Sequence, residues 1–331
     1  MAECDKEKTL HRRQFLARLA KAGASVAGAC GIAGWLYDSR PPPAQPSLAR
    51  QVTVPHFPPA VPGGATMSIV EGSERTKTAP KAIELLGGIE RFVKPGETVF
   101  IKPNAAFASP ASLGATTNPD LVACIVELCY HAGAKRVIVA DNPINDPASC
   151  FSVSGIAKAA SRAGAKVILP QPQMFKTTTL SGGKLIKNWP IFYGPLAEAD
   201  RLIGIAPVKN HYRAGASMAM KNWYGLLGGR RNIFHQDINT IIAELAQMVR
   251  PSLVILDGTQ VMVTNGPTGG STSDLKRANV MIASCDPVAA DAFGCSLLGL
   301  NVSDLPYLRK AEQAGAGVVD YESLKPLTAT A

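Results

Sequence analysis

Short runs of aliphatic residues alternate with longer segments of helical periodicity over most of the chain. The aliphatic runs predict strands over residues 97–103, 135–141, 166–169, 201–207, 253–256 and 280–284. The periodic segments predict helices over residues 118–131, 154–163, 217–227, 239–249 and 288–298. Such alternation is typical of a mostly parallel sheet with crossover helices, so we expect an α/β fold. Residues 171–195 break this pattern, and 177–186 within them predict an inserted hairpin.

Polar side chains follow the predicted strands at the points where those strands end. The residues concerned are Lys102, Asn104, Asp141, Asn142, Lys209, His211, Asp257 and Asp286. In open, Rossmann-like α/β sheets, ligands bind outside the carboxyl ends of the strands. These side chains are therefore candidates for a site at that edge of the sheet.

The densest group of candidates follows the strand at 201–207. It contains Lys209, His211, Arg213, Lys221, Arg230, Arg231 and His235. Such a group suits an anionic ligand, phosphate or carboxylate, with an imidazole for proton transfer or metal binding. The alternatives are a solvated loop for Lys209 and Arg213 and a hydrogen-bonded structural role for His211. We expect Trp223 and Tyr224 in the core.

A glycine-rich segment occupies residues 265–271, beyond the strand that ends at Asp257. Backbone N–H groups of such a loop bind phosphate in some proteins, and a plain turn fits the same pattern. The segment lacks both the Lys-Ser/Thr ending of a Walker loop and the Gly-x-Gly-x-x-Gly spacing. It is therefore weak evidence for a nucleotide site.

The first residues of the chain have the pattern of a twin-arginine export signal. Arg12 and Arg13 are followed by Gln-Phe-Leu and then by a weakly apolar stretch rich in alanine and glycine. We expect residues 1–37 to be a signal or anchor, which ends in lipidation of Cys30, in cleavage by signal peptidase, or as an uncleaved anchor. Residues 38–64 are rich in proline and predict a solvated tether to an α/β domain over 65–331. The expected location is periplasmic or otherwise extracytoplasmic, the twin-arginine translocase is an expected partner, and a membrane tether is possible.

Charge and cysteine usage narrow the function further. The 331 residues carry a formal net charge of +9, with no cluster of Lys and Arg interleaved with aromatic residues, so we expect no binding to nucleic acid. The seven cysteines contain no Cys-x-x-Cys pair, which argues against an iron–sulfur cluster of the ferredoxin type.

Several motifs, in order, resemble those of an uncharacterised family called domain of unknown function 362. They are Ile101-Lys102-Pro103-Asn104, Thr117-Asn118-Pro119, Ala199-Asp200, Pro207-Val208-Lys209-Asn210-His211, Lys221-Asn222-Trp223-Tyr224-Gly225, Gly266-Pro267 and Ser284-Cys285-Asp286-Pro287-Val288-Ala289-Ala290-Asp291. The resemblance covers about residues 97–300. It implies no particular reaction.

A more distant resemblance suggests chemistry. His211-x3-Gly215-x5-Lys221 is similar to a segment of the nickel-pincer lactate racemase family, in which the lysine carries a pyridinium mononucleotide that holds nickel. The resemblance implies that Lys221 is the attachment point, His235 a nickel ligand and His211 the acid/base. The racemase family's Asp-x-Thr-Arg phosphate motif is absent, and Lys102-Pro103-Asn104 stands in a comparable position.

These features predict an exported protein that binds an anionic ligand or cofactor. The enzyme hypothesis is a cofactor-dependent isomerase or oxidoreductase of small hydroxy acids. The alternative is a non-catalytic periplasmic protein that binds an anion or a metal. The roles expected are catalysis for His211 and Asp286, ligand or cofactor binding for Lys102, Asn104, Lys209 and Lys221, and metal binding for His235.

Overall fold

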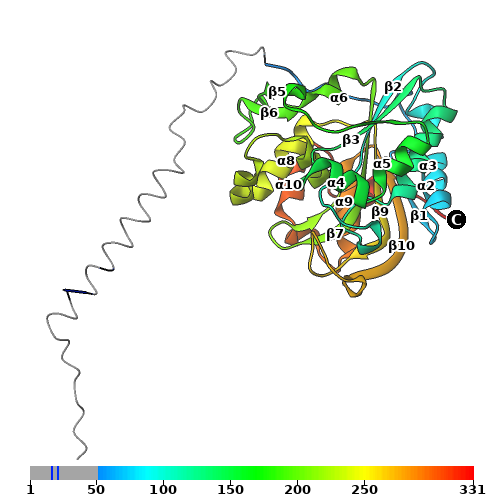
Figure 1. Cartoon of the computed structure of the whole chain (residues 1–331). Helices are drawn as coiled ribbons and strands as arrows, with labels where there is room; N and C mark the ends of the chain where they lie inside the picture. Colours follow the sequence, from blue (N-terminus) through cyan, green and yellow to red (C-terminus); the bar gives the residue numbers. More distant parts are fainter. Residues whose placement is uncertain (1–15, 18–20, 22–50) are drawn as a thin grey trace, which may run out of the picture. The chain divides into compact units, whose positions relative to one another are not determined.

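A computed structural model describes residues 16, 17, 21 and 51–331 (Figure 1). Most of the expected signal, including Cys30, and the first part of the expected tether therefore lie outside the described residues. No helix in the described part of the chain is long and apolar enough to span a bilayer.

A mixed sheet forms the centre of the domain (Figure 1). In sheet order its strands are β11 (Leu327–Thr330), β1 (Met67–Glu71), β10 (Leu275–Ser284), β9 (Leu253–Met262), β7 (Arg201–His211), β2 (Thr98–Lys102), β3 (Arg136–Ala140) and β4 (Lys166–Ile168). Only β10 runs against its neighbours along this path, and the short β8 (Gly215–Ser217) pairs antiparallel with the end of β7. The mostly parallel α/β fold expected from the sequence is confirmed.

Helices cover both faces of this sheet. One layer contains α2 (Arg75–Leu85), α3 (Pro119–His131), α4 (Pro147–Val153) and α5 (Ile156–Arg162). The other contains α6 (Tyr193–Glu198), α7 (Ala219–Asn222), α8 (Ile238–Met248), α9 (Pro287–Leu297) and α10 (Pro306–Gln313). Strand residues alternate between the layers: Val99 and Ile101 of β2 pack in the first core, and Phe100 packs in the second.

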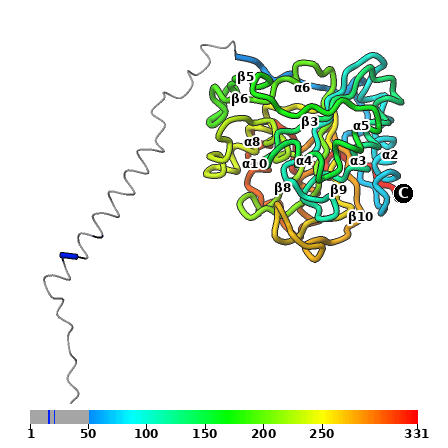
Figure 2. The backbone as a smooth tube through the Cα atoms, viewed as in Figure 1, coloured from blue at the N-terminus to red at the C-terminus, as the bar shows by residue number. Residues whose placement is uncertain are grey.

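The order of the strands reverses beside β2. The chain passes from β2 to β3 and β4 on one side, and then returns to place β7 and β9 on the other. Figure 2 traces the backbone of the domain in colours that follow the sequence. Lys102, the last residue of β2, pairs with Gly204, so residues 205–211 of β7 extend past the end of β2. A reversal of this kind opens a crevice at the carboxyl ends of the strands, where ligands bind in such sheets.

The inserted hairpin is present, with different strands from those expected. It consists of β5 (Phe175–Thr178) and β6 (Trp189–Phe192), whereas the sequence predicted its second strand at 184–186. The backbone N–H groups of that segment instead donate to the buried carboxylate of Glu244 on α8. A carboxylate that accepts several N–H groups removes the donors that a strand would use.

The described part of the proline-rich segment lies against the domain. The N–H of Val52 donates to the carbonyl of Thr177 at 2.9 Å, and the N–H of Phe57 donates to Arg250 at 2.9 Å. Val54 and Phe57 are buried. The proline content of residues 51–64 predicts a solvated tether. The structure differs, because apolar side chains of this segment pack into the core of the domain.

Candidate functional site

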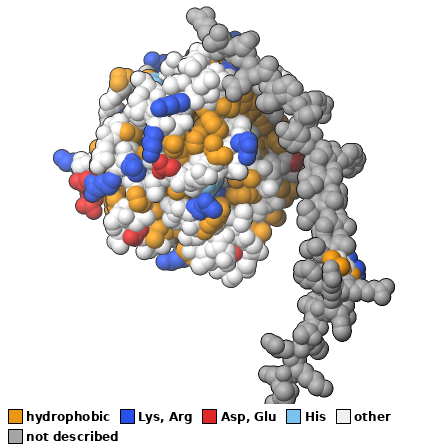
Figure 3. Space-filling view, turned by 90° about the vertical axis from the view of Figure 1, so that its left-hand side faces the viewer, with side chains coloured by type: hydrophobic (Ala, Val, Ile, Leu, Met, Phe, Trp, Pro, Cys, Tyr) orange, Lys and Arg blue, Asp and Glu red, His pale blue; other side chains and the backbone are white. Residues whose placement is uncertain are grey.

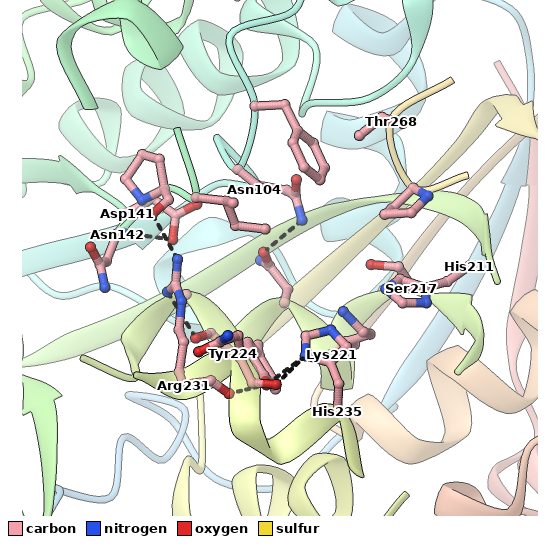
Figure 4. A pocket seen from close by; sticks show the side chains of 18 of the residues that line it. Asn104, Asp141, Asn142, His211, Ser217, Lys221, Tyr224, Arg231, His235 and Thr268 are labelled. Atoms are coloured by element: carbon pink, nitrogen blue, oxygen red, sulfur yellow. Dashed lines mark hydrogen bonds between the residues drawn. The ribbon is translucent and has the colours of Figure 1, made fainter. Parts of the chain in front are cut away.

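A cavity of about 1320 Å³ lies at the carboxyl ends of β2, β3 and β7 (Figure 4). Six of the seven residues given a role from the sequence line it, namely Lys102, Asn104, Lys209, His211, Lys221 and His235. Residues 265–269 of the glycine-rich loop form another part of its wall. The structure thus brings together side chains from five separate segments of the chain, at the place that the strand order predicts.

The floor of the cavity contains a buried ion pair. The Nζ of Lys102 lies 2.7 Å from the Oδ1 of Asp141, and both side chains are almost completely buried. Lys102 also donates to the side chain of Asn222 at 3.0 Å and to the carbonyl of Pro103 at 3.1 Å. The Oδ2 of Asp141 accepts the N–H of Ala105 at 2.8 Å. Burial lowers the pKa of Lys102, and Asp141 opposes that shift.

The backbone at Gly225 packs directly against this ion pair, and the absence of a side chain there leaves space for it. A Cβ at Gly225 would lie 2.1 Å from the Oδ1 of Asp141 and 2.7 Å from the Nζ of Lys102. The requirement here is space, because Gly225 is not among the residues with positive φ. The chain therefore needs glycine at this position to keep the floor of the cavity intact.

Lys209 is a second buried lysine of the cavity, and it has no carboxylate partner among the described residues. Its Nζ donates to the carbonyl of Ala115 at 2.6 Å and to the Oδ1 of Asn104 at 3.3 Å, and it lies 5.5 Å from the ring centroid of Phe107. Burial, with the nearby charge of Lys221, lowers the pKa of Lys209 to about 7. Lys209 is thus a buried cation whose charge no described residue neutralises by an ion pair.

Lys221 reaches the cavity from the short helix α7. Asp291 of α9 caps that helix: its carboxylate oxygens accept the N–H groups of Ala219 at 2.7 Å and Met220 at 3.0 Å. The Nζ of Lys221 has no hydrogen bond or ion pair with any residue in the described part of the chain, and it lies 5.1 Å from the ring centroid of Tyr224. Burial, and then the charge of Arg231, lower the pKa of Lys221 to about 8.

His211 is held as a neutral hydrogen-bond donor. Its Nδ1 accepts the backbone N–H groups of Arg213 and Ala214, both at 3.2 Å. Burial, with repulsion from Lys221, lowers its pKa to about 2, so the ring is neutral and its single proton is on Nε2. In this orientation Nε2 has no lone pair for a proton or a metal. The acid/base role expected for His211 is therefore revised to that of a donor.

His235 has the opposite tautomer. Its Nδ1 lies 3.2 Å from the carbonyl of Asn232 and 3.2 Å from the hydroxyl of Tyr224. That hydroxyl donates its proton to the carbonyl of Arg231 at 2.5 Å, so both neighbours of Nδ1 are acceptors. Nδ1 must therefore be the protonated nitrogen. Burial lowers the pKa of His235, which leaves a lone pair on Nε2 of the neutral ring.

The two imidazoles form a pair in one part of the cavity. Their ring centroids are 6.1 Å apart and the rings are inclined by 20°. Figure 4 shows His211, His235 and Lys221 at the same end of the cavity. A ligand at this end meets an N–H donor on one ring and a basic nitrogen on the other.

Asp286, which was given a catalytic role from the sequence, lies outside the cavity. Its Oδ1 accepts the N–H groups of Val288 and Ala289 at the start of α9, and its Oδ2 accepts the N–H of Val318 at 2.9 Å. Both oxygens are thus engaged with the backbone. The structure corrects the expected catalytic role to that of a helix cap.

Four residues that line the cavity were not among the seven given a specific role from the sequence: Asp141, Asn222, Tyr224 and Arg231. Asp141 was visible as a polar residue at a strand end, and Asn222 is the neighbour of Lys221. Tyr224 was expected in the core, and its ring is indeed buried, but its hydroxyl orients His235. Arg231 belonged to the cationic group expected to bind an anion, but its hydrogen bonds to the carbonyls of Pro143, Tyr224 and Leu227 are indicated by no sequence pattern.

The residues present fit the cofactor that the racemase resemblance implies. Lys221 is available for attachment, Nε2 of His235 for a metal, and Lys209 and Arg213 for a phosphate, all in one cavity. Such a group would supply a hydride acceptor. Within the described residues, no group of three or more His, Cys, Asp or Glu side chains could hold a metal ion by itself.

Comparison with known proteins places the chain in a family. It is 26% identical over 259 residues to the thylakoid-associated protein sll1697 of Synechocystis sp., covering 74% of this chain and 77% of that protein. Among solved structures, the lactate racemase apoprotein from Thermoanaerobacterium thermosaccharolyticum is similar with a TM-score of 0.40 and 14% identity; the match covers 72% of this chain and 57% of the racemase. Residues 99–296 match the family described as domain of unknown function (DUF362), and the chain belongs to that family.

Proposed function

We propose that this cavity binds a small organic anion, carboxylate or phosphate, and that His235 transfers a proton on it while His211 donates a hydrogen bond to it. The observation that supports the proposal is the charge of the wall. Five cationic side chains line the cavity, Lys102, Lys209, Arg213, Lys221 and Arg231, against Asp141 as the one carboxylate among the described lining residues. Asp141 is already paired with Lys102. The other four cations form no ion pair with a described residue, so their charge is left for a ligand.

The two rings suit different parts of one reaction. Nε2 of His235 has a lone pair and can take a proton from a C–H or O–H group of the ligand. The Nε2–H of His211 can donate a hydrogen bond to an oxygen on which negative charge develops. A neutral imidazole that donates in this way is an established means of polarising a carbonyl. This division of roles favours an isomerase or oxidoreductase of hydroxy or oxo acids over a protein that only binds its ligand.

Anion binding is expected to weaken as pH rises. The pKa values of Lys209 and Lys221 are lowered to about 7 and about 8, so between pH 6.5 and pH 9 both ammonium groups lose their charge. A charge-assisted hydrogen bond contributes about 1.5–3 kcal/mol, so the affinity for L-lactate or inorganic phosphate should fall at least about tenfold. Calorimetric titration at several pH values measures this.

Two variants make this test specific. Lys209→Met should weaken binding at pH 6.5 and flatten the pH dependence, whereas Lys158→Gln, which removes an exposed lysine on α5, should change neither. Affinity that is independent of pH and of Lys209 would disprove an anion site in this cavity. Binding by the unaltered protein without turnover of any hydroxy or oxo acid would favour the non-catalytic alternative.

We also propose that the protein acts on the far side of a membrane. The support is the Arg12-Arg13 motif in the sequence and the similarity to a protein named for its association with thylakoids. Changing both arginines to lysine should retain the chain in the cytoplasm, because twin-arginine export depends on that pair. Fractionation of cells that produce each form tests the proposal, with Lys158→Arg as a control. Equal export of both forms would contradict it.

A further inference from the structure

We propose that the amino group of Lys221 condenses with the carbonyl carbon of an anionic aldehyde or 2-oxo acid bound in this cavity, forming an imine. The proposal rests on the proposed anion site and names the class of ligand that this site takes. Its basis is the contrast between Lys221 and the other two lysines of the cavity wall.

The amino groups of Lys102 and Lys209 both have hydrogen-bond acceptors. The Nζ of Lys102 has Asp141, Asn222 and Pro103 as partners, and the Nζ of Lys209 has two acceptors. Lys221 lines the same cavity, yet its Nζ has no hydrogen-bond acceptor among the residues that the structure describes. An amine without acceptors, directed at a ligand cavity, is placed for attack on a carbonyl carbon.

The backbone that carries Lys221 is firmly held. Asp291 caps the first N–H groups of α7, and the indole ring of Trp223, next along, packs so closely on Gly204 that a Cβ there would lie 2.6 Å from it. Trp223 is completely buried. The position of the amine relative to the sheet is therefore set before a ligand binds, which lowers the entropic cost of attack.

The surroundings favour the reactive form of the amine. Burial, reinforced by the charge of Arg231, lowers the pKa of Lys221 to about 8, so more of the amine is uncharged near neutral pH than in an ordinary lysine. Desolvation and a neighbouring cation are the two known ways in which proteins activate a lysine for imine formation. The same cations hold the carboxylate or phosphate of the ligand.

The atoms of the step balance without a further reagent. The nitrogen lone pair forms a C–N bond, and the carbonyl oxygen takes up negative charge within reach of the cavity's N–H donor on His211. Proton transfer from nitrogen to that oxygen gives a carbinolamine, and loss of one water molecule gives the imine. Nothing is oxidised or reduced. The protonated imine then acidifies the neighbouring C–H, which the lone pair of His235 can deprotonate.

Borohydride trapping tests the proposal. The full-length protein is incubated with pyruvate and sodium cyanoborohydride, and the intact mass and the proteolytic peptides are measured. We expect one reduced pyruvate per chain on the peptide that contains Lys221. Lys221→Arg should reduce the adduct to background, while Lys158→Arg should leave it unchanged. Peptide mapping of the wild-type protein locates the adduct even if the Lys221 variant folds poorly.

The outcomes separate this proposal from the one on which it rests. L-Lactate has no carbonyl carbon that can condense, so its binding reports on the anion site alone. Lactate binding with no pyruvate adduct, or with an adduct on another lysine, would overturn the imine and leave the anion site in place. A group already attached to Lys221 in protein isolated from its own cells would also overturn it, since an occupied amine cannot condense. Absence of binding by either acid would refute the anion site itself.

Discussion

Replacing Asp141 by asparagine is expected to lower the free energy of unfolding by about 3–5 kcal/mol. The change keeps the shape of the side chain and removes its charge, so the ammonium of Lys102, which is completely buried, loses its counter-ion at 2.7 Å. An uncompensated buried charge has to be desolvated without the attraction that offsets this cost. Urea denaturation at pH 7 measures the difference, provided that the slope of the transition is unchanged.

A double variant distinguishes the effect of an unpaired buried charge on stability from the effect of altered packing. Lys102→Met combined with Asp141→Leu removes both charges and should recover most of the stability, because apolar side chains of similar volume replace a buried pair at little cost. Asp320→Asn, at an exposed position, should change the stability by less than about 0.5 kcal/mol. A loss below about 1 kcal/mol in Asp141→Asn would show that the pair does not carry the stability assigned to it.

Replacing Gly225 by alanine is expected to have a similar effect by a steric route. The added methyl group would occupy the space between the backbone and the Lys102–Asp141 pair, 2.1 Å from Oδ1 and 2.7 Å from Nζ. The pair must separate or the backbone must move, and we expect a loss of about 3 kcal/mol or more. The same displacement should weaken anion binding, because the pair forms the floor of the cavity.

Gly270→Ala is the matched control for this substitution. A Cβ at Gly270 would meet no atom within 4 Å, and Gly270 lacks a positive φ. Alanine there should be neutral or slightly stabilising, since it restricts the unfolded chain. Equal stability of the two variants would mean that the cavity floor can adapt to the methyl group.

The buried pair also explains why this site is polar at a depth where most folds are apolar. A buried ion pair is weak evidence for stability by itself, since apolar side chains can replace it. Here the pair forms part of a connected network, in which Asn222 accepts from Lys102 and from Asn104, and Asn104 in turn accepts from Lys209. The network fixes the cationic positions at the bottom of the cavity. One face of the molecule is also richer in Lys and Arg than in Asp and Glu side chains, which agrees with attraction of an anion (Figure 3).

The sequence by itself determined the class of fold and indicated where the ionisable side chains gather. Aliphatic runs separated by helical periodicity are local patterns, so the parallel strands and most helices could be predicted from them. The helix at 118–131 is a clear case, because Asn118 caps it and Pro119 begins it as the sequence indicates. Since strand ends converge in such folds, six of the seven residues given a role from the sequence line one cavity.

The lengths of the central strands depended on tertiary structure. The aliphatic run at 253–256 predicted a short strand, whereas β9 continues to Met262 because it pairs with the first residues of β10. In the same way β7 continues to His211 by pairing with β8. Hydrogen bonds to a partner strand, distant in sequence, stabilise polar residues in an extended form that local propensity does not favour.

Only the tertiary structure decided what each site residue can do. The tautomers of His211 and His235 follow from which backbone groups and hydroxyls face their Nδ1 atoms. The reactivity proposed for Lys221 rests on the lack of acceptors around its Nζ among the described residues. Asp286, a candidate by its place at a strand end, has both oxygens engaged by backbone N–H groups. Residue type and spacing indicate where ionisable groups gather, but the protonation and the orientation of each group are set by neighbours that the fold brings from elsewhere in the chain.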